Sequence, residues 1–346
     1  MQQLELDNIL SGSENALTDR QTDRQTDRQT DRQDDSWLDN EFLLQDRIQK
    51  IQQIIAQYGE DNFYIAFSGG KDSTVLSALI DMALPNNSIP RVYANTGIEL
   101  NMIRDFVFEL AKTDSRIEVI KPSVPVKKML ETEGYPFKSK MHSSYVKRYQ
   151  DKGLEHYKSV RAYIGNEMTL SGKPMFRPCP KVLKYQFSDE NTLKISDMCC
   201  VRLKEEPLRH WQKGNNKPYG IVGIMREEGG RRSNAQCLAF SGGKLNKFQP
   251  LAPITKEWEE WFIAKYNVTI CDIYKPPYNF VRTGCKGCPF ALNLQKELDT
   301  LEKFFPNERK QCEIIWKPVY EEYRRLGYRL KPNDNSQTKG QMNLFD

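Results

Sequence analysis

Residues 63–74 read FYIAFSGGKDST, an apolar run followed at once by two glycines and a group of polar residues. The apolar run predicts a buried β-strand, and the apolar spacing beyond the glycines predicts a helix over residues 73–84. Two adjacent glycines let the backbone turn tightly and approach an anion without Cβ atoms in the way. A helix that begins at such a turn directs its free N–H groups and the positive end of its dipole at the turn. The stretch therefore predicts a phosphate-binding loop between a strand and a helix.

The polar residues of this loop fit the same chemistry. Ser68, Ser73 and Thr74 add hydroxyl donors, and Lys71 supplies a positive charge. The loop is not a Walker A motif, because Asp72 follows the lysine where that motif has Ser or Thr. It contains no GxGxxG pattern either, so a dinucleotide-binding fold has no support. The alternative is a glycine turn that binds no ligand, and the full pattern SGGKDS after an apolar strand favours a nucleotide.

Strands and helices are expected to alternate along the chain on both sides of the loop. Further strands are expected at residues 91–95, 116–120 and 219–225, and further helices at residues 39–58, 100–112 and 126–133. Alternation at this spacing predicts right-handed crossovers and a parallel sheet with helices on both faces. The expected fold class is α/β, a Rossmann-like parallel sheet, with a helical C-terminal region.

Three parts of the chain differ in composition. Residues 18–33 spell TDRQ four times, without an apolar residue and with equal numbers of Asp and Arg. Such a repeat cannot contribute to a core, so residues 1–36 are expected to form a disordered tail. Residues 37–257 are expected to form the nucleotide-binding α/β domain, with a polar and irregular insertion at about residues 134–216. Residues 258–346 are expected to form the C-terminal helical region, which includes a CxxC loop.

Composition and charge exclude several classes of protein. The 346 residues carry 51 Lys and Arg against 46 Asp and Glu, and the net charge of +5 is too small to argue nucleic-acid binding by itself. No apolar run approaches the roughly 20 residues that a membrane-spanning helix needs, and the start of the chain lacks the features of a secretory signal. A cytoplasmic protein without a membrane partner is expected. The 8 cysteines are too sparse for a disulfide scaffold and are more typical of metal or redox groups.

The loop at residues 68–73 resembles the pyrophosphate-binding loop, or PP-loop, of the adenine nucleotide α-hydrolase superfamily. Its lysine is typical of the phosphoadenosine phosphosulfate reductase family within that superfamily. The resemblance implies that the chain binds an adenine nucleotide, either ATP or a sulfonucleotide, at the carboxyl edge of the parallel sheet. It also implies a binding set in the loop itself: Ser68, Gly69, Gly70, Lys71, Asp72, Ser73 and Thr74.

Two further segments extend this resemblance. Residues 95–97 read Asn-Thr-Gly where the family has Asp-Thr-Gly. Residues 223–232 resemble the family's Gly…Arg…Ser…Arg element, with Gly229 where a serine is common. Arginines at the end of a strand suit charge-assisted binding of phosphate or sulfate, and a solvated basic turn is the alternative. The resemblance implies that Asn95, Thr96, Gly97, Arg226 and Arg232 contact the nucleotide, and that Lys71, Asp72 and Arg226 are catalytic.

Four cysteines form a second group, in which Cys199 and Cys200 are adjacent and Cys285 and Cys288 form a CxxC. The CxxC spacing lets two thiolates reach one metal centre, and thiolate ligands favour zinc or iron–sulfur. An adjacent pair suits a cluster better than one tetrahedral Zn²⁺. The arrangement resembles the 4Fe–4S site of cluster-containing sulfonucleotide reductases and of DNA-sulfur-modifying proteins. Structural zinc and an inert buried thiol pair are the alternatives. The other cysteines and the histidines are expected to be structural.

The sequence leaves two alternative functions, sulfonucleotide reduction and nucleotide sensing without catalysis. Sulfonucleotide reduction requires, in the family, a mobile cysteine near the C-terminus. The last cysteine of this sequence is Cys312, in an apparently helical segment, and reactive cysteines need exposure and a stabilised thiolate. The other alternative is a non-catalytic nucleotide-sensing subunit of a modification complex, and the intact loop weighs against it.

The expected function is ATP pyrophosphatase or adenylyl-transfer chemistry coupled to sulfur incorporation, as in nucleic-acid phosphorothioation. ATP would adenylate an acceptor oxygen and release pyrophosphate, whose charge Lys71, the loop amides and Mg²⁺ would stabilise. A sulfur donor such as a cysteine desulfurase would then displace AMP. The basic and aromatic residues 138–157 suit DNA or RNA as a partner, and a solvated loop is their alternative.

Overall fold

A six-stranded sheet in the order β3-β2-β1-β4-β6-β5 forms the centre of the described chain. The computed structural model describes residues 39–175, 177–229 and 232–332, so the expected TDRQ tail lies outside the described residues. Neighbouring strands run parallel, except that the edge strand β5 pairs antiparallel with β6. The strands are β1 (Phe63–Phe67), β2 (Arg91–Ala94), β3 (Ile117–Ile120), β4 (Tyr219–Ile221), β5 (Leu238–Ser241) and β6 (Lys244–Phe248).

Helices cover both faces of this sheet. On one face, the helical residues 39–58 share an apolar core with α2 (Lys71–Ala83) and α9 (Lys256–Lys265). On the other face, α8 (Glu206–Gly214) lies against β2 and β3, and the ring of Trp211 is 5.4 Å from that of Tyr64 on β1. Successive side chains of a strand point to opposite faces, so β1 serves both layers. The predicted α/β class with its parallel sheet is confirmed.

Two elements around the loop differ in their bounds from those expected. α2 begins at Lys71 rather than at residue 73, since Gly70 takes the N-cap position and its carbonyl accepts the Thr74 N–H at 3.0 Å. β4 ends well before residue 225, because the chain turns there toward the start of α2. A Cβ on Gly223 would lie 3.0 Å from the Asp72 carbonyl oxygen. Lys71 and Asp72 therefore belong to the first turn of a helix.

The segment at residues 134–216, expected to be irregular, is largely helical. The expectation is wrong because a few large side chains, among them Val146, Val160 and Tyr163, bury one face of each helix in spite of the polar composition. Cys199 and Cys200 lie at the start of a continuous helix that includes one π-helical turn. The elements are α5 (Lys140–Lys152), α6 (Lys158–Ile164), η2 (Lys181–Phe187), α7 (Met198–Cys200), the π-helical turn η3 (Val201–Glu205) and α8.

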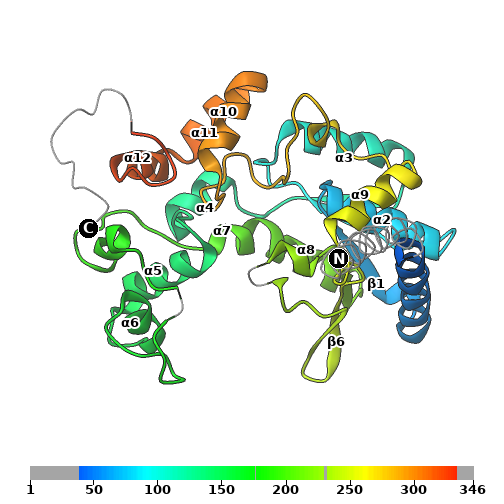
Figure 1. Ribbon diagram of the computed structural model, residues 1–346, viewed down its shortest axis with the longest axis horizontal. Helices are drawn as coiled ribbons and strands as arrows, with labels where there is room; N and C mark the ends of the chain where they lie inside the picture. Colours follow the sequence, from blue (N-terminus) through cyan, green and yellow to red (C-terminus); the bar gives the residue numbers. More distant parts are fainter. Residues whose placement is uncertain (1–38, 176, 230–231, 333–346) are drawn as a thin grey trace, which may run out of the picture.

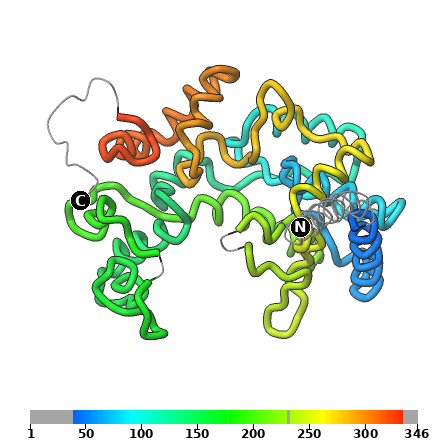
Figure 2. Tube along the Cα trace, in the orientation of Figure 1, coloured from blue at the N-terminus to red at the C-terminus, as the bar shows by residue number. Residues whose placement is uncertain are grey.

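A second apolar core joins this segment to the C-terminal helices, at the end of the molecule away from the sheet (Figure 1). The chain reaches it from α9 through η6 (Asp272–Tyr274) and a long irregular stretch that Figure 2 shows in yellow and orange. The division at residue 258 stays a prediction. In the described ranges, no helix combines the length and apolarity needed to cross a bilayer. The remaining helices are α3 (Asn101–Thr113), α4 (Val126–Glu133), α10 (Leu294–Phe304), α11 (Pro306–Ile315) and α12 (Lys317–Arg325).

The turn between β1 and α2 packs against α3 without room for a side chain. Gly69 has a φ of +70°, and a Cβ there would lie 2.4 Å from Cγ2 of Val107 and 3.1 Å from Cγ2 of Ile103. Both neighbours are buried in the core and cannot move aside freely. The second residue of the loop is therefore glycine for two reasons, its backbone conformation and the contact with α3.

Replacing Gly69 by alanine should destabilise the protein more than the matched change Gly153→Ala. Gly153 has a φ of +75° and nothing within 4 Å of the added Cβ. Both changes place alanine in the left-handed region, at a cost of about 1 kcal/mol. Overpacking against α3 should add about 1–3 kcal/mol at Gly69 alone. Urea denaturation would measure both free energies of unfolding, and equal losses would contradict the packing argument.

Candidate functional site

The hydroxyl groups of the β1–α2 loop hold the loop in shape. The Ser73 hydroxyl donates to the Gly70 carbonyl at 2.9 Å, and the Thr74 hydroxyl donates to the same oxygen at 3.0 Å. The Ser68 and Ser73 hydroxyls are 3.0 Å apart, and the Ser68 N–H also donates to Ser73. Ser68 is exposed, while Ser73 and Thr74 are buried. The loop is therefore fixed by its own side chains before any anion meets it.

Lys71 is paired with a residue that sequence reasoning did not select. Its Nζ lies 2.9 Å from Oε2 of Glu259 on α9, and the Glu259 side chain is 1% exposed. Burial raises the pKa of Glu259 to about 7, and the nearby Asp72 adds to the effect. Burial, followed by the charge of Glu228, raises the pKa of Asp72. A signal was present in the sequence, because Glu259 falls among the inward residues of a helix whose neighbours Trp258 and Phe262 are apolar.

The structure separates the two arginines expected at the nucleotide. Arg232 forms an ion pair with Glu228, and both charges act on the pKa of Asp72, so this pair lies beside the start of α2. Arg226 is exposed, and its Nε donates to the Ala235 carbonyl at 2.6 Å. The catalytic role expected for Arg226 stays a prediction.

Residues 95–97 form a loop that is closed by Glu99, a second residue that sequence reasoning missed. The buried Glu99 carboxylate accepts the N–H groups of Thr96 and Gly97, each at 3.1 Å, and the Thr96 hydroxyl. The Asn95 side-chain oxygen accepts the Gly97 N–H at 3.1 Å. In this conformation the polar groups of the loop face one another. The expected contacts of these residues with a nucleotide stay a prediction.

A cavity of about 480 Å³ opens beside Lys71 and Asp72. One end is charged and includes Glu228 and Glu259. Its other walls come from α9 and from residues 270–282, including Phe280 and Val281. The cavity therefore combines a polar end at the start of α2 with an apolar wall, which is typical of sites for small ligands.

The CxxC loop lies directly against the loop that Glu99 closes. Glu99 and Cys285 form an antiparallel β-bridge, and the Lys286 N–H donates to the Ile98 carbonyl at 2.7 Å. The Lys286 side chain is 2% exposed, and its Nζ lies 3.1 Å from Glu308 on α11. The two segments selected from the sequence, the nucleotide loops and the CxxC, are therefore neighbours.

The four cysteines selected from the sequence lie in one region. A hydrogen bond with Cys200 raises the pKa of Cys199, and the charges of Cys288 and Cys285 raise it further. The same hydrogen bond lowers the pKa of Cys200 to about 6. Within the described ranges, however, no three Cys, His, Asp or Glu side chains have the arrangement of a metal site. The thiols are close together, but their side chains do not enclose a metal in this conformation.

Basic residues near the thiols differ in their partners. The charge of Cys285 raises the pKa of Lys204, so this ammonium lies among the thiols. Arg202 instead pairs with Glu133 and Glu206, each at 2.7 Å. Of these two basic residues, Lys204 is the one placed beside the cysteines.

The cysteines outside this group have surroundings typical of core residues. Cys179, Cys271 and Cys312 are buried, and Cys237 is half-buried. Cys312 lies inside α11 with no exposed surface, and burial raises the pKa of its thiol to about 12. His142 is also buried, between the Tyr163 hydroxyl and the Gln186 side chain. The buried thiol of Cys312 does not suit a nucleophile, because reactive thiols need exposure and a stabilised thiolate.

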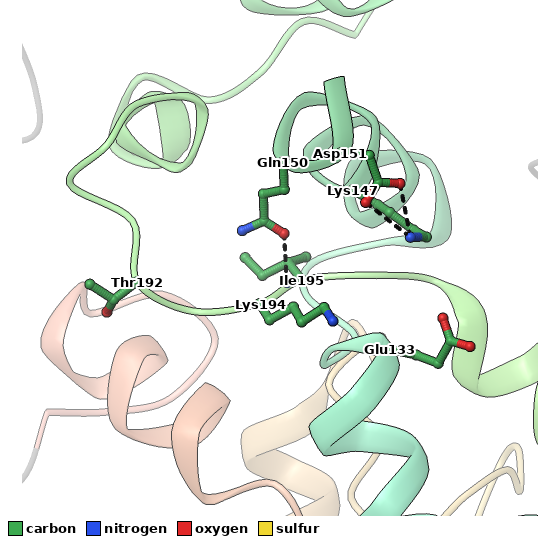
Figure 3. A pocket seen from close by; sticks show the side chains of 7 residues that line it. All are labelled: Glu133, Lys147, Gln150, Asp151, Thr192, Lys194 and Ile195. Carbon is green, nitrogen blue, oxygen red and sulfur yellow. Dashed lines mark hydrogen bonds and ion pairs between the residues drawn. The ribbon is translucent and has the colours of Figure 1, made fainter. Parts of the chain in front are cut away.

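A smaller cavity of about 180 Å³ lies between α4, α5 and residues 192–195 (Figure 3). Lys147 pairs with Asp151 at 2.9 Å, and the Gln150 oxygen accepts the Ile195 N–H at 3.1 Å. Because these polar groups already have protein partners, this cavity is not a candidate site.

Comparison with known proteins identifies one domain. Residues 62–171 match the family described as the phosphoadenosine phosphosulfate reductase domain. A search of curated proteins found no match. The matched residues include the β1–α2 loop and residues 95–97 but none of the four grouped cysteines.

Several solved structures are distantly similar. The phosphoadenylyl-sulfate reductase of Candida auris is 14% identical, with 69% of this chain and 87% of that chain covered and a TM-score of 0.39. The NH3-dependent NAD synthetase of Campylobacter jejuni is 10% identical, with 81% and 94% covered and a TM-score of 0.37. A tRNA thiolase of Methanococcus maripaludis, described with its 4Fe–4S cluster, is 15% identical, with 81% and 80% covered and a TM-score of 0.33.

The assignment is carried by the domain match, because the structural similarities are weak. The match begins at β1 and includes the loop from which the family was expected. Residues 62–171 therefore match the phosphoadenosine phosphosulfate reductase domain, as the loop at residues 68–73 led us to expect.

Proposed function

We propose that this chain is an ATP pyrophosphatase or adenylyl transferase that couples ATP cleavage to sulfur incorporation into a nucleic acid. The observation that carries the proposal is the glycine turn at the start of α2, where Lys71, Asp72 and Arg232 lie together beside a cavity of about 480 Å³. The free N–H groups and dipole of a helix start favour an anion at this place. The family match supports a nucleotide with phosphate or sulfate groups.

In the proposed step, an acceptor oxygen forms a bond to the α-phosphorus of ATP while the bond to pyrophosphate breaks. Pyrophosphate leaves with the bonding electrons, and Lys71 and the loop amides stabilise its charge. Mg²⁺ is expected to arrive with ATP, held mainly by the phosphates, as is usual for this ion. Persulfide sulfur on a donor such as a cysteine desulfurase then bonds to the acceptor atom that carried this oxygen, and AMP leaves with the oxygen. A thiol reductant supplies the two electrons that cleave the sulfur–sulfur bond to the donor.

Each of the two alternative functions, sulfonucleotide reduction and nucleotide sensing without catalysis, makes a different demand on the structure. Sulfonucleotide reduction has the name of the family domain in its favour. Against it stands the position of Cys312, whose thiol is enclosed in α11. A nucleotide-sensing subunit without catalysis would bind ATP through the same loop and release no pyrophosphate.

Four thiols beside Lys204 suit an iron–sulfur cluster in donor type and charge, although they do not enclose one in this conformation. We propose that Cys199, Cys200, Cys285 and Cys288 hold a 4Fe–4S cluster, with Zn²⁺ as the alternative. A bound cluster would join two distant segments and supply an electron relay. Lys204 would offset part of its negative charge.

A nucleic acid is proposed as the partner because positive charge is concentrated in one part of the chain. Residues 138–184 contain eleven Lys and Arg against three Asp and Glu, a net charge of +8, whereas the whole chain carries +5. Within them, the Arg148 guanidinium lies 5.6 Å from the ring centres of both Tyr145 and Tyr157. α5 and α6 lie in this part of the chain, far from β1 along the long axis (Figure 1).

Lys71→Ala should lower pyrophosphate release from ATP by about 100-fold or more, the size expected when one group that stabilises the leaving charge is lost. Asp72→Asn should also lower it, because a carboxylate beside the phosphates would help to hold the Mg²⁺ that arrives with ATP. Lys213→Ala, at an exposed position of α8, serves as the control and should retain full activity. Circular dichroism would check that each variant is folded. Unchanged release in both loop variants would remove the loop from the reaction, and ATP binding without release in the wild type would favour the sensing subunit.

Anaerobically purified protein should be brown, with absorption at about 400 nm and stoichiometric iron and sulfide. Cys285→Ser should lose most of this absorption, because a ligand is removed. Cys237→Ser should keep it, since Cys237 lies outside the group, next to Arg47. A colourless protein with one Zn²⁺ per chain would overturn the cluster in favour of zinc.

The triple variant Lys152→Ala, Lys158→Ala and Lys181→Ala should weaken binding to single-stranded DNA or RNA. All three lysines are exposed, and each phosphate contact that is lost should reduce the salt dependence of log K by about 0.7. Fluorescence anisotropy at several salt concentrations would measure this slope. A control triple variant at Lys213, Lys247 and Lys303 removes the same charge from other elements. Equal slopes for both variants would contradict a binding surface at residues 138–184.

A further inference from the structure

Glu259 occupies an unusual position for an acidic residue. It lies buried on α9, between the buried Trp258 and the exposed Glu260 in the sequence. The cation closest to it is Lys71, at 2.9 Å, and the same ammonium lies 4.0 Å from Glu260. Glu260 is 73% exposed and is surrounded by water, whereas Glu259 depends on Lys71 for its charge balance.

The phosphates of a nucleotide compete for this same lysine. Lys71 lies in the first turn of α2, at the loop where an anion would be bound. A lysine that turns toward the phosphates leaves Glu259 as a buried carboxylate without its cation. Such a group is costly in a protein interior, and it becomes neutral by binding a proton.

We propose that Glu259 is a positioning residue that holds Lys71 at the start of α2, and that a bound nucleotide takes Lys71 over, so that binding is accompanied by the uptake of one proton. The inference rests on the proposed function, because it requires an adenine nucleotide at this loop. Asp72 is the carboxyl group next to Glu259, and the two groups influence each other's protonation.

The surrounding charges set the pH range of this uptake. Burial already raises the pKa of Glu259 to about 7 while Lys71 is beside it. Removing the lysine takes away a group that lowers this pKa, so the pKa rises further and the proton is bound above pH 7. Affinity for the nucleotide should therefore fall as the pH rises from about 7 to 8.5. The charged and titratable groups around the pair are Lys71 and Asp72 from α2, Lys256 and Glu260 from α9, Glu228 and Arg232 from residues 226–232, and Tyr274 and Arg282 from residues 274–282.

The test is calorimetric titration with α,β-methylene-ATP and Mg²⁺ at about pH 8, in two buffers of different ionisation enthalpy. The difference in binding enthalpy between the buffers gives the number of protons taken up. Wild type and Glu260→Gln should take up about one proton more than Glu259→Gln, because only Glu259 loses its partner. Protons exchanged by the nucleotide itself cancel in this comparison.

A second measurement keeps the proposal testable if Glu259→Gln does not fold. The dissociation constant of wild type should rise by up to about tenfold per pH unit between pH 7.5 and 8.5. Equal proton numbers in wild type and Glu259→Gln, or an affinity that does not change with pH, would overturn the inference. Wild type that does not bind the nucleotide at all would instead refute the proposed function.

Discussion

The site depends on how the chain passes from β1 into α2. Gly69 lies so close to Val107 and Ile103 of α3 that no side chain fits, and a Cβ on Gly223 would lie 3.0 Å from the Asp72 carbonyl oxygen. These two contacts fix the first turn of α2 between α3 and the end of β4. This turn carries two charged groups of the cavity, Lys71 and Asp72, and both interact with others: Lys71 pairs with Glu259, and the charges of Glu228 and Arg232 act on the pKa of Asp72.

The same packing connects the nucleotide loops with the thiols. Glu99 closes residues 95–97 with its carboxylate and pairs with Cys285 through its backbone. Lys286, inside the CxxC, is anchored to Glu308. A displacement of the CxxC loop would therefore also move Glu99 and the loop at residues 95–97, which follows β2. This coupling runs through hydrogen bonds of the backbone and a buried ion pair, and both are rigid connections.

Local patterns in the sequence are sufficient for the core of the fold. The strand, glycine turn and helix at residues 63–84 are predicted because apolar periodicity and glycine chemistry act over a few residues, and the domain match includes the same stretch. The helices at residues 134–216 were not expected, since their polar composition hides narrow apolar faces. Glu99 and Glu259 were missed for a different reason. Their partners are set by tertiary packing, and in the case of Glu259 the partner is 188 residues away in the chain.

The π-helical turn η3 lies between two functional parts of one helix, the cysteines at its start and Trp211 near its end. Each residue of an α-helix advances the side-chain direction by about 100°, and a π-turn accommodates one extra residue without breaking the rod. Cys199 and Cys200 lie before this turn, and Trp211, which packs on Tyr64 of the sheet, lies after it. The widened turn thus sets the angle, measured around the helix axis, between the direction of the two cysteine side chains and the direction of Trp211. Shortening the helix by one residue there would rotate one end relative to the other by that angle, although the sequence of both ends would be unchanged.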